Sequence, residues 1–503
     1  MLFNSYIFIL IFLPLTLLGY YILNHFKRYE MSKAFLAGMS LWFYAYFDVK
    51  YLGVIVSSVL INYLLSYIIL RKESRSGNLP DLTKRIFVIL GISFNLGVLI
   101  YFKYLDFIIE NINLVIKGHI NTLNILLPLG ISFFTFQQLS FIIDRALGRA
   151  KHYKFINYLT FVTFFPQLVA GPIVLYDEMM PQFEDVNNKK FSYDNFTRGV
   201  LLFTFGLAKK VLLADVLAVS VNFGFDNALF LDSVSTALLI LAYTFQLYFD
   251  FSGYSDMAIG LGRMFNIELP VNFNSPYKAA SVKEFWQRWH ITLSRFFIKY
   301  VYIPMGGSRK GRIRTLFNVF MIFFLSGIWH GANWTYIVWG VMHGIAVVWD
   351  NLYLIGVKDA SNKKEPKIII PRFAGWFFTF VFFNLSLIFF RSENLSTAFT
   401  LFKNLFSFKY TGYLPKLTSS LNIPELYLIE KIVDLKAPQF NNMLSVIIFI
   451  LFMILCTLII KGKNAYELAK CRLTAKTAVV CALLLSWCII SFSQVSTFIY
   501  FNF

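Results

Sequence analysis

Charged residues are scarce in this chain. Only 15% of its 503 residues are Asp, Glu, Lys or Arg, whereas 57% are hydrophobic and 19% are aromatic. A soluble domain cannot bury that much apolar surface, so the composition excludes a soluble globular protein and predicts an all-α polytopic membrane protein. Acidic residues are rarer than basic ones, and the formal net charge is +19. The basic residues lie in short loops between apolar runs, which argues against nucleic acid as a partner and favours contact with anionic lipid headgroups.

Cysteine is rare as well. The four cysteines form no C-x-x-C pair and lie mostly in apolar runs, which predicts small apolar fillers rather than disulfides or metal ligands. We find no internal repeat, which argues against a transporter built from two repeated halves. The first apolar run has no basic residue before it and no small-residue cleavage site, so we expect a first transmembrane helix rather than a signal peptide.

Apolar stretches long enough to cross a bilayer recur along the chain. They cover roughly 5–23, 32–47, 50–70, 86–108, 122–143, 155–175, 198–221, 232–254, 315–331, 334–354, 372–390, 442–460 and 475–493. Stretch 155–175 contains Pro166 and ends in Ala170-Gly171-Pro172, and we expect a re-entrant segment there, since irregular backbone at membrane depth must lie against protein or a cavity. Segment 255–314 has no clean span and is predicted to form short amphipathic helices on the cytoplasmic face. Segment 391–440 is expected to be an amphipathic insertion, on a side that the sequence leaves open.

The loop charges predict an orientation. Basic residues follow the first, third and fifth stretches and precede the last one, and loops of this kind remain in the cytoplasm. Alternation of the spans then places both the N-terminus and the C-terminus outside. The residues are Lys27, Arg28, Lys33, Arg71, Lys72, Arg75, Lys84, Arg85, Arg145, Arg149, Lys151, Lys154, Lys461, Lys463, Lys470, Arg472 and Lys476.

Two histidines, His330 and His343, lie within the apolar run 323–349. An ionisable side chain at membrane depth is costly and tends to mark a functional site. The neighbouring Gly331 and Gly344 allow other groups to approach closely, and an imidazole is suited to proton transfer. A lone histidine in such a run is more often a hydrogen-bonded core residue, so both interpretations stay open on this ground alone.

A second block, 283–294, combines charges with aromatic residues. At helical spacing Trp286, Trp289 and His290 share one face. For the tryptophans alone we favour the simpler interpretation of an interfacial aromatic belt, with Arg288 reaching towards water.

A third block, 302–312, places Gly306-Gly307 beside Arg309, Lys310 and Arg312. Backbone amides of a glycine turn next to basic side chains can hold phosphates. The pattern by itself is weak, because a basic cytoplasmic loop needs no ligand.

Together these blocks resemble the membrane-bound O-acyltransferase (MBOAT) family, and more narrowly its alginate and peptidoglycan O-acetylation branch. The resemblance covers residues 1–395 well, is weak over 396–440 and returns at the C-terminus. It rests on the motifs Phe285-Trp-x-x-Trp289-His290-Ile-Thr-Leu-Ser294, Tyr302-Ile-Pro-Met-Gly-Gly307, Gly327-Ile-Trp-His330-Gly-Ala-Asn333-Trp, Pro128-Leu-Gly-Ile-Ser132-Phe-Phe-Thr-Phe-Gln137, Phe165-Pro-Gln-Leu-Val-Ala-Gly-Pro172 and Gln246-Leu-Tyr-Phe-Asp250-Phe-Ser-Gly-Tyr-Ser-Asp256-Met-Ala-Ile-Gly260.

The resemblance implies one membrane domain over 1–503, with about eleven transmembrane helices, re-entrant segments and short amphipathic helices around a funnel. It implies that His330 is the catalytic general base and that His290 is the second catalytic histidine of the family, expected near the cytoplasmic mouth, where it positions the thioester or polarises its carbonyl. His343 matches no family position, so the core interpretation stays ahead for it. Asn333 is expected to orient His330, and the other donor-binding or orienting groups are Trp286, Arg288, Arg309, Lys310 and Arg312, with no metal.

The C-terminal tail Phe498–Phe503 has two interpretations. An aromatic anchor at the outer interface is the simpler one. The family resemblance implies instead that Tyr500 carries the acyl group in the outer funnel. A phenol hydroxyl with a pKa of about 10 is a poor nucleophile, so it needs a base such as His330.

The resemblance implies transfer of an acetyl group from a cytoplasmic thioester, with acetyl-CoA as the expected donor and no bound cofactor. The acetyl group then passes to an extracytoplasmic partner of the SGNH-hydrolase type, which acetylates a polysaccharide outside a bacterial inner membrane. Abundant Phe, Ile, Lys and Asn indicates an AT-rich genome, which disfavours the alginate-making pseudomonads and so favours peptidoglycan as the polymer. Alginate, another exopolysaccharide and D-alanyl transfer to teichoic acid stay open. Rival classes are a lipid- or protein-acylating enzyme, a transporter without chemistry, and an assembly subunit.

Overall fold

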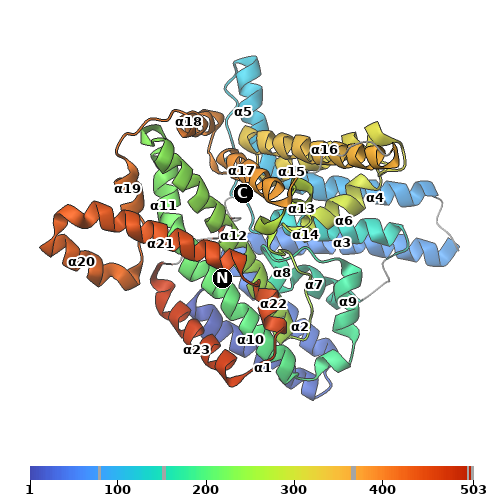
Figure 1. Ribbon diagram of the computed structural model, residues 1–503. Coiled ribbons are helices and arrows are strands. Elements are labelled where there is room, and N and C mark those ends of the chain that lie inside the picture. The colour runs from blue at the N-terminus through green and yellow to red at the C-terminus, as the bar shows by residue number, and fades with distance from the viewer. Residues whose placement is uncertain (77–80, 150–153, 364–369, 495–497, 500–503) are drawn as a thin grey trace. The chain divides into compact units, whose positions relative to one another are not determined.

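The computed structural model describes residues 1–76, 81–149, 154–363, 370–494 and 498–499. Over these residues the chain forms helices and no β-strand (Figure 1). It divides into two compact units, the first made of Met1–Phe205 and Tyr254–Val271, the second of Gly206–Gly253 and Asn272–Phe503. The long helix α12 (Ser233–Met264) contributes to both units.

Phenylalanine side chains pack against one another in the core of the first unit. The rings of Phe12, Phe43 and Phe165 are buried, with centroids 5.2–5.6 Å apart, a spacing at which aromatic rings attract one another. The elements are η1 (Phe8–Phe12), α1 (Leu13–His25), α2 (Tyr29–Ala45), α3 (Val49–Ser76), α4 (Asp81–Leu99), η2 (Ile100–Tyr104), α5 (Leu105–Ile116), α6 (Ile131–Ala146), α7 (Phe155–Thr163), α8 (Phe165–Leu168), α9 (Tyr176–Glu184), η3 (Asn187–Lys189) and most of α10 (Tyr193–Ala208).

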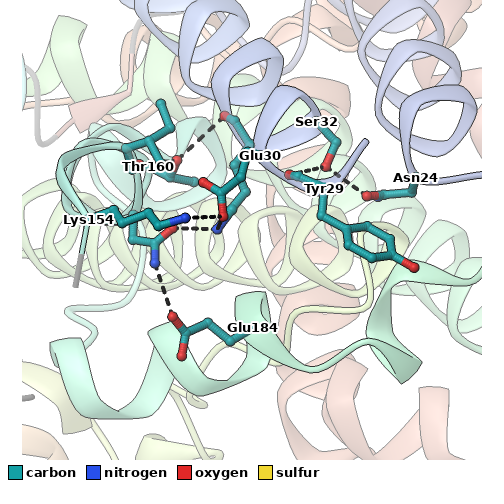
Figure 2. A network of polar contacts seen from close by, with 10 residues as sticks. Asn24, Tyr29, Glu30, Ser32, Lys154, Thr160 and Glu184 are labelled. Carbon is teal, nitrogen blue, oxygen red and sulfur yellow. Dashed lines mark hydrogen bonds and ion pairs between the residues drawn. The ribbon is translucent and has the colours of Figure 1, made fainter. Parts of the chain in front are cut away.

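A polar network links α2, α7 and α9 of this unit (Figure 2). Lys33 is buried and donates to Asn157 Oδ1 at 2.5 Å and to Glu30 at 3.1 Å. Asn157 in turn donates to Glu184 at 3.1 Å, and Lys154 pairs with Glu30 at 3.5 Å. The prediction that Lys33 lies in an exposed loop is therefore wrong, because the residue lies in α2 and its ammonium is satisfied inside the unit.

The second unit holds the histidines that the motifs single out. Its elements are the rest of α10, η4 (Lys209–Ala214), α11 (Asp215–Asp226), η5 (Ala228–Phe230), the first part of α12, η6 (Pro276–Lys278), α13 (Val282–Trp286), α14 (Ile291–Phe297), η7 (Ile298–Tyr302), α15 (Arg312–His330), α16 (Trp334–Lys363), α17 (Arg372–Arg391), α18 (Leu395–Leu405), α19 (Leu414–Ser419), η8 (Pro424–Leu426), α20 (Tyr427–Lys436), η9 (Pro438–Phe440), α21 (Asn441–Lys461), α22 (Ala465–Lys470), α23 (Ala475–Ile490) and η10 (Ser491–Gln494).

Helices α15 and α16 pack with their backbones in contact. A Cβ atom at Gly327 would lie 2.5 Å from the carbonyl oxygen of Tyr336, and one at Gly340 would lie 2.6 Å from that of Phe323. Small residues let two helices approach this closely. The close approach brings the last turn of α15, with His330, against the side chains of α16.

Eight helices in the described residues are long and apolar enough to cross a membrane. They confirm most of the longer predicted spans, whereas the count of about eleven stays a prediction. The first half of the predicted span 122–143 is wrong: α6 begins only at Ile131, after Gly130 in the left-handed region (φ 71°). The irregular backbone expected in 155–175 is confirmed, because α7 ends at Thr163, α8 ends at Leu168 and residues 169–175 are not helical. The predicted boundary at 255 is wrong, since α12 continues to Met264.

Candidate functional site

His330 is the last residue of α15 and lies in an aromatic enclosure of the second unit. Its ring is 4.9 Å from that of Trp329, 5.0 Å from that of Trp339 and 5.2 Å from that of Phe390, measured between centroids. The side chain is buried, with 3% of the residue exposed. These neighbours shield the imidazole from solvent and hold it in one orientation, as a general base requires.

A small cavity of about 10 Å³ lies next to His330. This is about the least volume that one water molecule needs, so the site is closely packed. The indole Nε1 of Trp339 is buried on the wall and has no hydrogen-bond partner among the described residues. Trp339 is therefore a donor within the enclosure that sequence reasoning did not single out. The cavity is lined by Leu247, Trp289, His330, Trp339, Phe383, Leu387 and Phe390.

His290 is fully buried and adopts a left-handed backbone conformation (φ 44°) immediately before α14. Its Nδ1 lies 3.2 Å from Oδ1 of Asn272, which also accepts the backbone N–H and the hydroxyl of Thr292 at 3.2 and 2.9 Å. An oxygen that accepts these bonds requires Nδ1 of His290 to be the donor, so the lone pair of the neutral ring is on Nε2. Burial lowers the pKa of His290 to about 3, which keeps the ring neutral.

His343 is held by hydrogen bonds on both ring nitrogens. The indole Nε1–H of Trp286 donates to Nδ1 at 3.2 Å, so Nε2 carries the proton and donates to Ser386 Oγ at 3.0 Å. The Ser386 hydroxyl in turn donates a hydrogen bond to the carbonyl oxygen of Phe383 at 2.7 Å. The chain of bonds is complete and the residue is fully buried, as the core interpretation of His343 predicts.

The prediction that Trp286, Trp289 and His290 share one helical face is wrong. Helix α13 ends at Trp286, and the left-handed residue His290 separates it from α14. Trp286 consequently points to His343, whereas the ring of His290 meets Phe251 at 4.8 Å. The interfacial-belt interpretation of the tryptophans is also wrong, because both are buried, and Trp289 stacks on Phe285 at 5.5 Å.

The remaining donor candidates lie elsewhere in the second unit. Arg288 forms an ion pair with Glu284 at 2.9 Å. Asn333 donates to the carbonyl oxygen of Glu393 and accepts the backbone N–H of Thr335; neither bond reaches His330, so an orienting role for Asn333 finds no support in its hydrogen bonds.

Arg309 and Lys310 are exposed in the turn between η7 and α15, and Arg312 is exposed as the first residue of α15. Gly306, Gly307 and Gly311 in this turn all have positive φ, which glycine adopts without strain. The turn presents its basic side chains to the surface, where an anionic group can reach them.

The C-terminal tail reaches the His290 side of the site. Phe498 is buried, with its ring 5.7 Å from that of Phe251, and the backbone N–H of Ile499 donates to Asp250 Oδ2 at 2.9 Å. Buried Phe498 does not fit an anchor at a membrane surface. Tyr500 and the last three residues, 501–503, lie outside the described residues, so the acyl-carrier interpretation of Tyr500 stays a prediction.

Comparison with known proteins agrees with these motifs. The family model of the membrane-bound O-acyltransferases matches residues 146–392, which include both His290 and His330. The peptidoglycan O-acetyltransferase of Helicobacter pylori is 39% identical over 533 aligned positions, covering 100% of this chain and 98% of that protein. A probable alginate O-acetylase of Pseudomonas aeruginosa is 38% identical over 81% of this chain and 75% of its own length. The teichoic acid D-alanyltransferase of Streptococcus thermophilus is 29% identical over 52% of this chain and 65% of its own. The chain belongs to the membrane-bound O-acyltransferase family.

Proposed function

We propose that this protein is the membrane acyltransferase of a peptidoglycan O-acetylation system. It takes an acetyl group from acetyl-CoA on the cytoplasmic side of a bacterial inner membrane and delivers it outside, where both termini lie. The match to the Helicobacter pylori protein supports peptidoglycan, since it extends over the whole chain, including the insertion 391–440, whereas the match to the alginate O-acetylase covers 81% of the chain.

One observation carries the proposal: a series of ring contacts runs from the tail to His330. Phe498 contacts Phe251 at 5.7 Å, Phe251 contacts His290 at 4.8 Å, His290 contacts Trp329 at 6.1 Å, and Trp329 contacts His330 at 4.9 Å. The tail and both family histidines therefore belong to one buried aromatic cluster. A tail whose only role was to anchor the protein at a surface would not need this cluster.

The reaction takes place in two transfers. In the first, His330 removes the phenol proton of Tyr500, the phenolate oxygen attacks the thioester carbonyl, and the carbon–sulfur bond breaks. The thiolate of the donor leaves and takes up a proton, and Tyr500 holds the acetyl group as an ester. In the second, a hydroxyl of an extracytoplasmic partner of the SGNH-hydrolase type attacks this ester, and the Tyr500 oxygen regains a proton.

In this scheme the unprotonated Nε2 of His290 can accept a hydrogen bond but cannot donate one. Its Nδ1–H is committed to Asn272, and the neutral ring has no second N–H with which to polarise a carbonyl. We assign it to positioning the donor. The exposed groups Arg309, Lys310 and Arg312 attract the anionic donor to the cytoplasmic mouth, since like-charged clusters raise the local concentration of an oppositely charged substrate.

The test is acetyl transfer to the tail. Purified protein incubated with labelled acetyl-CoA should acquire label on Tyr500, and Tyr500→Phe, which loses only the hydroxyl, should acquire none. His330→Ala should slow labelling by about 10²–10⁴-fold, the usual contribution of a general base, while the protein still inserts in the membrane. Label on no C-terminal peptide, or full activity of Tyr500→Phe, would reject the carrier role.

The acceptor polymer is tested separately in cells. Deletion of the gene should abolish O-acetyl groups on peptidoglycan, and the His330→Ala variant should fail to restore them. Unchanged peptidoglycan acetylation together with a loss of acetyl groups from an exopolysaccharide would move the assignment to alginate-like polymers. Loss of D-alanyl esters from teichoic acid would move it to the third group of relatives.

A further inference from the structure

We infer that Asp250 is a positioning residue that clamps the C-terminal tail in the site by accepting the backbone N–H of Ile499. The inference rests on the proposed function, because it concerns how the residue before Tyr500 is held. It adds a buried ionic cluster, made of Asp250, Lys210 and Asp215, which none of the roles above requires.

The cluster is closed to solvent. The Lys210 ammonium lies 2.6 Å from Asp250 Oδ1 and 2.8 Å from Asp215 Oδ1, and the three side chains are only 2–3% exposed. Buried charges persist only when they are paired and hydrogen-bonded. One ammonium faces two carboxylates here, so the second oxygen of Asp250 needs a further donor, and the N–H of Ile499 supplies it at 2.9 Å.

The backbone at Lys209–Ala214 departs from a regular α-helix, and this departure brings members of the cluster together. Residues five apart on a regular α-helix are separated by about 140° around its axis, so Lys210 and Asp215 would point in different directions. The stretch Lys209–Ala214 is instead a π-helical turn, in which the N–H of Asp215 binds the carbonyl of Lys210. Turns of this kind occur frequently at functional sites. The π turn brings Lys210 and Asp215 together, and Lys210 then reaches Asp250 on α12.

The tail is held by two consecutive residues of α12. Asp250 accepts a hydrogen bond from the N–H of Ile499, and the next residue, Phe251, packs against the ring of Phe498. The ring of Phe251 also contacts that of His290, at 4.8 Å. The two contacts fix the position of the chain along α12 one residue before Tyr500. The contact at Ile499 uses the backbone, so it requires an N–H at this position and no particular side chain.

This requirement gives a matched pair of variants. Ile499→Pro removes the N–H while the whole ionic cluster is kept, because proline has no amide proton. Ile499→Val keeps the N–H and is the control. Two measurements are made on the full-length protein in detergent: the rate at which labelled acetyl-CoA acylates Tyr500, and the rate at which a carboxypeptidase releases residues 501–503.

We expect Ile499→Pro to label Tyr500 about tenfold more slowly or worse, as for loss of a hydrogen bond to a charged acceptor, with the apparent affinity for acetyl-CoA unchanged. We expect its last residues to be released about tenfold faster than in the wild type, and Ile499→Val to match the wild type in both assays. Asp250→Asn, provided that it folds, should resemble Ile499→Pro. If it does not fold, the proline and valine pair carries the test.

The outcomes separate the clamp from the proposed function. If the proline and valine variants are labelled at equal rates and digested at equal rates, the clamp is overturned, whether or not the wild type labels Tyr500. Faster digestion of Ile499→Pro in a protein whose wild type never labels Tyr500 would establish the clamp and reject the acyl-carrier role. Digestion of Tyr500→Phe at the wild-type rate, with no label, is expected if both proposals hold.

Discussion

Replacing His343 separates a structural histidine from a catalytic one. Both His330 and His343 lie in one apolar run, and the two ring nitrogens of His343 are hydrogen-bonded to Trp286 and Ser386. We therefore expect His343→Ala to destabilise the protein, and His343→Gln, which offers one acceptor and one donor at similar volume, to be much milder.

The size of the effect follows from the contacts. Truncation leaves the buried indole N–H of Trp286 without its acceptor, which costs about 1–3 kcal/mol. It also removes a ring packed 4.6 Å from that of Trp339 and 5.0 Å from that of Phe382, and large-to-small changes in a core cost about 2–5 kcal/mol. Allowing for partial collapse of the cavity, His343→Ala should lose about 3–6 kcal/mol in free energy of unfolding, and His343→Gln about 1–2 kcal/mol.

The assay combines thermal unfolding in detergent with acetyl transfer per folded molecule. His343→Gln should unfold a few degrees below the wild type and keep transfer within about threefold, because both ring nitrogens of His343 are used in structural hydrogen bonds rather than in proton transfer. His330→Ala should show the reverse, with normal unfolding and transfer reduced by about two orders of magnitude or more. A well-folded His343→Gln variant as inactive as His330→Ala would refute the structural assignment.

Two further predictions concern charge. Because burial lowers the folded-state pKa of His290 to about 3, the unfolded chain takes up a proton below pH 6.5 that the folded protein does not. The contribution of neutral His290 to the free energy of unfolding should thus be complete above pH 6.5 and fall by about 1.4 kcal/mol per pH unit below it. Thermal unfolding of the wild type should show a loss of about 2 kcal/mol between pH 7.5 and pH 5 relative to His290→Gln. Equal pH dependence of the two proteins would show that the ring titrates normally. Replacing Arg309, Lys310 and Arg312 by glutamine should raise the apparent KM for acetyl-CoA, more strongly at low salt, and an effect independent of salt would indicate a structural role.

Hydropathy predicts the long helices well because the thickness of the hydrocarbon layer demands about 20 apolar residues. The predicted span 372–390 corresponds to α17 (Arg372–Arg391), and 442–460 to α21 (Asn441–Lys461). The same measure fails at 122–130, where the residues are apolar but Pro128 and Gly130 prevent a helix from forming before Ile131.

The finer geometry of the site has no such signal in the sequence. A helical period cannot reveal that His290 takes a left-handed conformation, since the residue that holds it there, Asn272, is 18 positions away. The meeting of Lys210 with Asp215 requires a π turn that a regular period excludes. Motif resemblance marks which histidines matter, and long-range hydrogen bonds decide what each of them can do.

The close packing around His330 bears on unwanted hydrolysis. A general base beside an activated thioester can also assist attack by water, and the acetyl group would then be lost as acetate. The space next to His330 is about 10 Å³ and its walls include Leu247, Phe383 and Leu387, so little water can gather at the base. Under the proposed mechanism, a phenol tethered to the protein would compete with few solvent molecules at His330. The aromatic walls would then limit the share of acetyl groups that is lost to water.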